Sequence, residues 1–390
     1  MKKIIHIASD EKFINSAYWQ FSKAFPNQNI FYLLVDCPDK ELKYVEINED
    51  FILVKNKLKE IKDLAKSFSH DEIVCFHGLD YFRSIVLVNL PKSTTIIWFL
   101  WGMEIHNNAN IVSKNNTLGS LTYATFYANS KKEIILTRFK DLFRQFFYKI
   151  TLRGDSPQNA IYKAIRKANY CGILYQEEFQ FIKQKIETDI KYFKFSYYPI
   201  ELMVRDNNSM VTSDNILLGN SASESNNHLE AFEILQNLPL RKRKIITPLS
   251  YGKPIYQKVI VEKGEKLFPK NLQPLLDFMP LHEYNTYLKQ CGIVIMNHYR
   301  QQAVGNVLTM LWMGAKVYLD ERNSLYTYLI RIGIIVFSIQ KDLNSNNPTV
   351  FLLLDHLERE KNRQILQFEI GQDKLLDELK KQMDVIMNES

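Results

Sequence analysis

Short apolar runs alternate with amphipathic segments along the N-terminal part of the chain. The runs are almost continuously apolar, as expected for strands buried on both faces of a parallel sheet. They cover residues 3–9, 29–35, 72–77 and 94–101. The segments between them have helical periodicity and cover residues 12–25, 58–67 and 81–90. This rhythm predicts a doubly wound α/β domain.

The rhythm changes between residues 120 and 168. Apolar positions in 133–153 recur at helical spacing, and basic residues occupy or flank the other side, so we predict a basic amphipathic helix there. A second basic helix is predicted at 158–167, and a strand at 170–175 resumes the sheet. Residues 191–214 end in a polar, Asn/Ser-rich stretch, which predicts a linker.

The second half of the chain repeats the strand–helix pattern. Strands are predicted at 215–218, 244–249, 272–278, 292–297 and 316–319. Helices are predicted at 228–236, 256–264, 282–290, 305–313 and 372–387. We therefore predict two Rossmann-like domains, 1–205 and 206–390, with a basic helical insert at about 120–168. The carboxyl ends of both sheets are expected to face one central cleft, where ligands of such folds bind.

The positive charge of the chain is concentrated in one window. Residues 119–168 hold ten Lys or Arg and three Asp or Glu, an excess as large as the net charge of the whole chain, +7. The rest is balanced, which argues against a nucleic-acid-binding protein. The 133–153 helix either packs on the core or lies on an anionic membrane. Because no run of 18 apolar residues occurs, we expect peripheral attachment, at the cytoplasmic face.

Two strand ends in the second half carry residues suited to phosphate. The first is Gly219-Asn220-Ser221, followed by Ser225, Asn226 and His228 before an apolar helix. Glycine allows close backbone approach, polar side chains donate hydrogen bonds, and a helix N-terminus favours anions. The motif is neither a dinucleotide fingerprint nor a P-loop. The alternative interpretation is an ordinary helix cap.

The second is Arg300-Gln301-Gln302, followed by Gly305-Asn306 at a predicted helix start. Arg300 could pair with a departing diphosphate, or form only a surface ion pair. The chain contains no DxD motif, so we predict neither a metal nor another cofactor, with cations and helix dipoles neutralising the leaving group. Asp320-Glu321 follows the next strand; a carboxylate there, with Glu321 as the candidate, could bind ribose or sugar hydroxyls, or the pair belongs to a solvated turn.

Two such domains around one cleft resemble the GT-B glycosyltransferases, in which transfer of a sugar with inversion requires one general base. Inversion is favoured because Thr309 and Met310 stand where retaining enzymes of this architecture carry a glutamate. The candidate bases lie at strand ends of the first domain: Glu104, Asp10 and His77. The alternative roles are a local pair for Glu104, a helix cap for Asp10 and a core histidine for His77. We rank Glu104 and Asp10 above His77.

Several blocks of the chain together resemble one enzyme family. They are Phe76-His77-Gly78, Trp98 with Trp101-Gly102, the GNS…SNxH block at 219–228, the stretch 287–291, and the RQQxxG block at 300–305. These resemble the TDP-N-acetylfucosamine:lipid II N-acetylfucosaminyltransferases, glycosyltransferase family 56, also called 4-alpha-L-fucosyltransferases. The resemblance runs from about residue 3 to 340. It implies a GT-B fold, an inverting mechanism and peripheral attachment to the inner face of the bacterial cytoplasmic membrane.

The resemblance also implies a reaction. Members of the family move 4-acetamido-4,6-dideoxygalactose from a TDP donor to an undecaprenyl-diphosphate-linked disaccharide. We therefore expect transfer of a deoxy-acetamido sugar from a TDP or UDP donor to a lipid-linked oligosaccharide, in cell-surface polysaccharide synthesis. Two alternatives stay open: a GT-B enzyme acting on a soluble sugar, including an epimerase, and a non-catalytic nucleotide-sugar binder.

Overall fold

The computed structural model describes residues 3–68, 72–127, 148, 154–204 and 209–389. The chain divides into two compact units. The first unit comprises Met1–Ser113, Lys132–Pro199 and Gln372–Ser390, and the second comprises Lys114–Lys131 and Ile200–Gly371. The chain therefore passes from one unit to the other four times.

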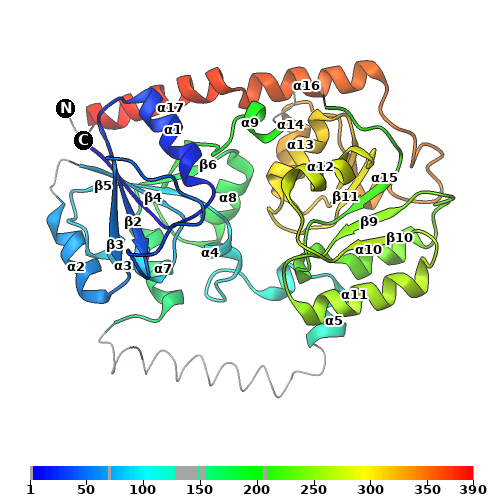
Figure 1. The fold of residues 1–390 in the computed structure, drawn as a ribbon, viewed down its shortest axis with the longest axis horizontal. Coiled ribbons are helices and arrows are strands. Elements are labelled where there is room, and N and C mark those ends of the chain that lie inside the picture. The colour runs from blue at the N-terminus through cyan, green and yellow to red at the C-terminus, as the bar shows by residue number, and fades with distance from the viewer. Residues whose placement is uncertain (1–2, 69–71, 128–147, 149–153, 205–208, 390) are drawn as a thin grey trace. The chain divides into compact units, whose positions relative to one another are not determined.

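The first unit is built on a parallel sheet with strand order β3-β2-β1-β4-β5-β6-β7. Its strands are β1 (Ile4–Ala8), β2 (Asn29–Val35), β3 (Phe51–Lys55), β4 (Ile73–His77), β5 (Thr95–Phe99), β6 (Tyr170–Ile173) and β7 (Lys191–Lys194). Its helices are α1 (Ile14–Ala24), α2 (Leu58–Ser67), α3 (Tyr81–Asn89), α4 (Met103–His106), α7 (Pro157–Lys167), α8 (Gln176–Lys185) and α17 (Gln372–Glu389). Apolar clusters fill both faces of the sheet: α1 and α17 cover one, while α2, α3 and α7 cover the other (Figure 1).

The second unit is built on a parallel sheet with strand order β10-β9-β8-β11-β12-β13. Its strands are β8 (Ile216–Leu218), β9 (Ile245–Pro248), β10 (Leu272–Leu275), β11 (Ile293–Met296), β12 (Lys316–Leu319) and β13 (Phe337–Ser338). The order reverses between β8 and β11, which is the switch point where ligands of such sheets bind.

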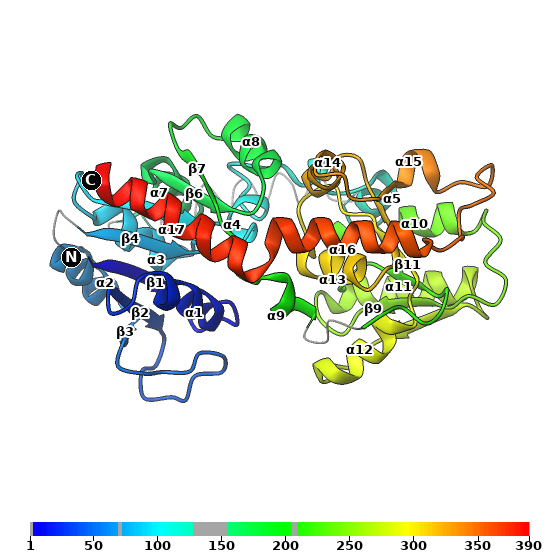
Figure 2. The same ribbon diagram turned by 90° about the horizontal axis from the view of Figure 1, so that it is seen from above.

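Helices cover both faces of the second sheet. They are α5 (Ser120–Tyr127), α9 (Ile200–Val204), α10 (His228–Leu235), α11 (Pro254–Leu267), α12 (Leu281–Lys289), α13 (Val304–Trp312), α14 (Ser324–Arg331), α15 (Ile339–Asp342) and α16 (His356–Ile370). Figure 1 shows α10 and α11 on one face and α12 and α13 on the other. Helix α16 packs against α13 and leads into α17 (Figure 2).

Strands β3 and β13 and helices α8, α14 and α16 were not predicted from the sequence, and two further differences concern β7 with α9 and the unit boundary. The residues before the predicted polar linker form β7 and α9, in which Phe193 and Ile200 are buried. The predicted boundary at 205/206 leaves out two exchanges: α5 belongs to the second unit and α17 to the first. The amphipathic helix predicted at 133–153 lies, except for Tyr148, outside the described residues.

Two further observations concern the environment of the chain. Among the helices that the structure describes, none is long and apolar enough to cross a membrane. The four cysteines are free thiols; Cys75, Cys171 and Cys291 are buried, and Cys37 is half-buried.

Candidate active site

The turn after β8 requires glycine at its first position. Gly219 has a φ of +68°, and an added Cβ would lie 2.5 Å from His228 Nε2 and 2.7 Å from Asn226 Oδ1. Asn226 is fully buried; its Oδ1 accepts a hydrogen bond from the Asn220 backbone N–H at 2.9 Å and lies 2.8 Å from His298 Nε2. Asn226 therefore holds the turn in shape, because its amide oxygen accepts a hydrogen bond from the turn and its amide nitrogen donates one to Ser221 O.

His228 is a second buried support beneath the same turn. Its ring lies 3.0 Å from the Tyr256 hydroxyl, and its side chain is fully buried. Burial lowers the pKa of His228 to about 3, so the imidazole is neutral at physiological pH. Of the predicted phosphate-binding residues in this block, Asn226 and His228 thus support the turn, while Gly219 and Asn220, which are themselves buried, form the turn.

A chain of hydrogen bonds joins the turns after β8 and β11. Gln302 Nε2 donates to Asn220 Oδ1 at 3.0 Å, and Ser225 Oγ donates to Gln302 Oε1 at 2.6 Å. Arg300 NH2 lies 3.4 Å from Ser225 Oγ, and Asn220 Nδ2 donates to the Tyr251 hydroxyl at 3.0 Å. The structure therefore brings four of the predicted donor-binding residues together across the switch point of the sheet. We call the turns 219–228 and 300–306 the cradle.

The first turn of α13 lies beside this chain. Ala303, with a φ of +55°, caps the helix, so Gly305 and Asn306 stand in its first turn rather than before it. Gly305 is exposed, and a Cβ added there would meet nothing within 4 Å. The Gln301 side-chain oxygen is buried and has no hydrogen-bond partner among the described atoms. Backbone N–H groups at a helix start are a feature of an anion-binding turn.

Replacing each of two cradle glycines, Gly219 and Gly305, by alanine should have different effects on stability. We expect Gly219→Ala to lower the free energy of unfolding by about 1–3 kcal/mol, because alanine is strained at this φ and its Cβ would collide with two buried side chains. Gly305→Ala should leave stability unchanged or raise it by about 0.5 kcal/mol, since it fills open space in a helix. Urea denaturation of the two variants measures the difference; equal losses would contradict this account of the turn.

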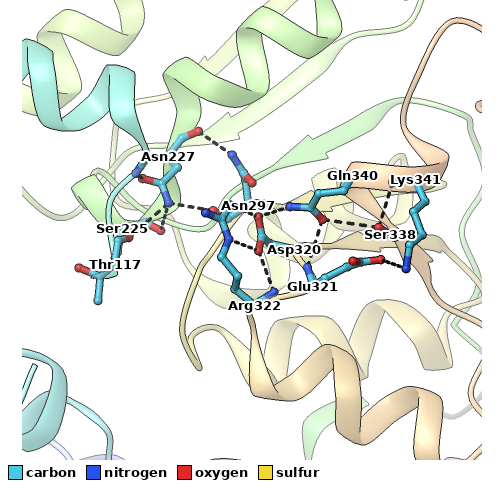
Figure 3. A network of polar contacts seen from close by, with 11 residues as sticks. Thr117, Ser225, Asn227, Asn297, Asp320, Glu321, Arg322, Ser338, Gln340 and Lys341 are labelled. Atoms are coloured by element: carbon cyan, nitrogen blue, oxygen red, sulfur yellow. Dashed lines mark hydrogen bonds and ion pairs between the residues drawn. The ribbon is translucent and has the colours of Figure 1, made fainter. Parts of the chain in front are cut away.

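A polar pocket opens at the carboxyl ends of β11, β12 and β13. Its volume is ≈ 250 Å³, and it is lined by Glu230, Ile234, Asn297, Tyr299, Asp320, Arg322, Ile339, Gln340 and Leu343. Asp320 is buried and accepts hydrogen bonds from Arg322 Nε at 2.8 Å and Gln340 Nε2 at 2.6 Å (Figure 3). The Arg322 guanidinium also stacks on Tyr299, 3.3 Å from the ring centroid. The charge of the Asp320 carboxylate is thus balanced by Arg322, and both of its oxygens are held by hydrogen bonds.

Glu321, the candidate for binding ribose or sugar hydroxyls, lies outside the polar pocket. Its carboxylate pairs with Lys341 Nζ at 2.6 Å, and it does not line the pocket (Figure 3). Of this pair of acids, Asp320 is the one that faces the pocket. Sequence reasoning also missed the other polar lining residues, although each follows a buried strand or opens α10. These residues could have been found by their position, because polar residues at the carboxyl ends of consecutive strands lie where such sheets bind ligands.

The segment that carries α5 is bound tightly to the start of α10. Asn227 accepts a hydrogen bond from the Gly119 N–H at 2.8 Å and donates to Asn297 O at 3.0 Å. Glu230 accepts from the Thr122 N–H at 2.8 Å and from its hydroxyl at 2.6 Å. Figure 3 shows Asn227 between Thr117 and Asn297. A segment from the first third of the chain therefore completes the support of the cradle.

In the first unit, Asp10 and His77 have structural partners. The Asp10 carboxylate accepts hydrogen bonds from the backbone N–H groups of Lys43, Tyr44 and Val45 at 2.6–3.0 Å, so it holds that loop rather than capping α1. His77 is fully buried, with its nitrogens 3.0 Å from His6 Nδ1 and 3.0 Å from the Tyr197 hydroxyl. Burial lowers the pKa of His77 well below its usual value. His77 therefore matches its structural alternative, a core histidine, whereas Asp10 has neither the predicted helix-capping contact nor a free carboxylate.

Glu104 is also buried with local hydrogen-bond partners, as its structural alternative predicts, but burial shifts the pKa of its carboxyl upward. It stands in α4, just after β5, and is 5% exposed. Its Oε1 accepts hydrogen bonds from the Trp101 backbone N–H at 3.0 Å and from Trp98 Nε1 at 3.2 Å. Burial raises the pKa of the carboxyl, an effect that these hydrogen bonds oppose. A carboxylate tuned upward by burial is suited to accepting a proton near neutral pH.

The buried histidines predict sensitivity to acid. Burial lowers the pKa values of His6 and His228 to about 3, whereas each is 6.5 in the unfolded chain. The unfolded chain therefore takes up protons first, and the free energy of unfolding should fall as pH drops from about 6.5 towards 3. Thermal melts between pH 7 and 4 measure this. His228→Gln should reduce the slope, while replacing the exposed His356 should not; identical slopes in all three proteins would contradict it.

Comparisons with known proteins agree with this geometry. The model of the family described as 4-alpha-L-fucosyltransferase, glycosyl transferase group 56, matches residues 164–374. The matched range contains the cradle and the polar pocket.

Several solved structures are similar over the whole chain. An alpha,alpha-trehalose 6-phosphate synthase from Burkholderia multivorans has a TM-score of 0.60 at 11% identity, covering 100% of this chain and 99% of its own. A sucrose-phosphate synthase from Thermosynechococcus elongatus has a TM-score of 0.63 at 8% identity, covering 100% of both chains. A trehalose-6-phosphate structure from E. coli, described as bound with UDP-2-fluoro glucose, has a TM-score of 0.62 at 9% identity, covering 99% of both chains. These similarities confirm the predicted GT-B fold of two Rossmann-like domains.

Proposed function

Since this chain belongs to the 4-alpha-L-fucosyltransferase family, glycosyl transferase group 56, and is therefore a glycosyltransferase that uses a nucleotide-sugar donor, we propose a specific reaction. The enzyme moves a deoxy-acetamido sugar, such as N-acetylfucosamine, from a TDP or UDP donor to a lipid-linked oligosaccharide in cell-surface polysaccharide synthesis. It acts as a peripheral protein at the cytoplasmic face of the bacterial inner membrane.

The observation that carries the donor assignment is the hydrogen-bond chain across the switch point, from Asn220 through Gln302 and Ser225 to Arg300. In this proposal the diphosphate of the donor lies over the Gly219-Asn220 turn and the first turn of α13. The Arg300 guanidinium and the helix N–H groups balance its charge. We propose that they do so without a metal, in keeping with the lack of a DxD motif.

The polar pocket is the proposed site of the donor sugar. Asp320 is held with both oxygens engaged, while Asn297 and Gln340 add amide groups that can both donate and accept. Ile234, Ile339 and Leu343 supply apolar wall. Mixed amide, carboxylate and apolar lining suits a sugar that presents hydroxyls and an amide on one side and carbon-bound hydrogens on the other.

The proposed reaction is an inverting transfer. The Glu104 carboxylate takes the proton of the acceptor hydroxyl, whose oxygen forms a bond to the anomeric carbon. The bond from that carbon to the diphosphate oxygen breaks, and its electron pair leaves with the nucleoside diphosphate. Charge develops on the diphosphate in the transition state, so cations and helix N–H groups aimed there lower the barrier.

The membrane assignment rests on charge. Residues 119–168 hold the net positive excess of the chain, and anionic headgroups attract such clusters. The alternative in which the acceptor is a soluble sugar predicts no affinity for lipid. Flotation of the full chain with vesicles containing anionic lipid separates the two: co-flotation that declines with salt supports the membrane acceptor, and protein that stays at the bottom of the gradient favours the soluble one.

A thermal-shift panel tests the donor assignment. TDP, UDP, GDP, CMP and ADP are each added with magnesium and with EDTA. A ligand that binds only the folded state raises the melting temperature. We expect a shift with TDP or UDP that persists in EDTA. A shift that needs magnesium would overturn the metal-independent route, and no shift with any nucleotide would favour a chain that has lost donor binding.

A further inference from the structure

Exposed apolar side chains gather at the carboxyl ends of β9 and β10. Tyr251 is 59% exposed, Ile255 is 76% exposed and Phe278 is 87% exposed. Single exposed apolar residues are ordinary, so exposure alone assigns no role. Tyr251 differs from the other two because its hydroxyl accepts a hydrogen bond from Asn220 Nδ2, at 3.0 Å. One end of this side chain is therefore tied to the cradle while its ring faces solvent.

The backbone around Tyr251 is fixed against the turn after β8. The Ala222 N–H donates to Tyr251 O at 2.8 Å, and the Lys253 N–H donates to Ala222 O at 2.8 Å. Between them, Gly252 has a φ of +127°, and an added Cβ would lie 2.4 Å from Ala222 O. Only glycine permits so close an approach, so the ring is held beside the cradle by main-chain contacts as well as by its hydroxyl.

The strand order of the sheet indicates which part of a donor would lie beside Tyr251. In a doubly wound unit, a ligand whose phosphates lie over the first strand–helix turn extends its nucleoside over the end of the neighbouring second strand. Here the first strand is β8 and its neighbour is β9, on the side away from β11. The polar pocket lies at the other side, at the ends of β11, β12 and β13. An aromatic side and a polar side therefore flank the cradle.

We propose that the Tyr251 ring is the stacking platform for the nucleobase of the donor. The proposal rests on the proposed nucleotide-sugar function and adds a ligand subsite to it. A nucleobase is planar and stacks on an aromatic face whatever its identity. Tyr251 therefore contributes affinity for nucleoside diphosphates generally, and the choice among bases is made by other groups. The ring, and not the hydroxyl, carries the contact, while the hydroxyl holds the ring in position.

Calorimetric titration of the full chain tests this. Wild type, Tyr251→Ala and Tyr251→Phe are titrated with TDP, UDP and inorganic pyrophosphate. Base–aromatic stacking corresponds to about 5- to 150-fold in affinity, so we expect Tyr251→Ala to weaken TDP and UDP binding by a factor in that range. Affinity for pyrophosphate should be unchanged, because it has no base to stack. Tyr251→Phe keeps the ring and should bind the nucleotides within about threefold of wild type.

Phe278→Ala is the control, because it removes an aromatic ring that is also exposed but has no hydroxyl to tie it to the cradle. It should bind TDP as wild type does. Nucleotide affinity in Tyr251→Ala equal to wild type overturns the proposal, and so does an equal loss in Tyr251→Phe, which would assign the effect to the hydroxyl. Loss of pyrophosphate affinity in Tyr251→Ala would show a collapsed cradle and also overturns it. A wild type that binds pyrophosphate but no nucleotide would instead refute the proposed donor.

Discussion

Replacing Glu104 by glutamine should lower turnover by about 10²- to 10⁴-fold while leaving nucleotide affinity unchanged, the usual range for loss of a general base. The amide oxygen of glutamine can still accept the hydrogen bonds that the Trp101 N–H and Trp98 Nε1 donate to Glu104 Oε1. The variant therefore removes the ability to take a proton and keeps the local contacts. Turnover at saturating donor, together with a melting curve, separates a catalytic loss from an unfolded protein.

The pH profile gives a second readout of the same group. Burial raises the pKa of Glu104, and only the ionised carboxylate can act as a base. Wild-type turnover should therefore rise with pH through this raised pKa, and the limb should vanish in Glu104→Gln. Asp10→Asn is the control, because Asp10 holds the 43–45 loop and should change stability more than the profile. Glu104→Gln with turnover within threefold of wild type would place the base elsewhere.

Removing Arg300 should weaken the binding of nucleoside diphosphates by about 10- to 150-fold, since hydrogen bonds to charged groups contribute roughly 1.5–3 kcal/mol. Arg300 stands at the end of the hydrogen-bond chain that includes Ser225 and Gln302. Titration of Arg300→Ala with TDP and with thymidine measures the effect: only the diphosphate should bind more weakly. Arg300→Lys keeps the charge but loses the forked geometry, so we expect an intermediate affinity.

Salt dependence adds a control to this prediction. An interaction between a cation and a diphosphate weakens as ionic strength rises. The affinity of wild type for TDP should fall with salt more steeply than that of Arg300→Ala. Unchanged TDP affinity in Arg300→Ala would mean that the diphosphate lies away from the turn after β11, and the assignment of that turn would be wrong.

The central strands could be predicted from the sequence because burial on both faces leaves an apolar run. Ile293–Met296 is an example: all four residues of β11 are buried. Three of the four edge strands, β3, β7 and β13, could not, because one side of each is open to solvent. Strand β7 has the sequence KYFK, in which only Phe193 is buried, so its pattern does not indicate a strand. The unit boundaries were missed for another reason: Asn227 and Glu230 bind residues more than a hundred positions earlier.

The site was predictable where local backbone demands a residue type. Gly219 stands at a positive φ with no room for a side chain, so the motif around it carries a local signal. No local sequence signal indicates how the side chains of Asp320 and Glu321 are oriented. These neighbours point to different partners, Arg322 and Lys341, and tertiary contacts alone decide which carboxylate faces the pocket. The exposed position of Tyr251 beside Asn220 was likewise set by the pairing of β9 with β8.

The most direct measurement is transfer itself. The purified full chain is incubated in EDTA with TDP-linked 4-acetamido-4,6-dideoxygalactose and a polyprenyl-diphosphate-linked disaccharide in vesicles, and the lipid is analysed by mass spectrometry. We predict that the acceptor gains the mass of one such sugar residue, and that the free disaccharide does not. A folded, TDP-binding protein that leaves the lipid unchanged, or that transfers only to the free sugar, would contradict the proposed function.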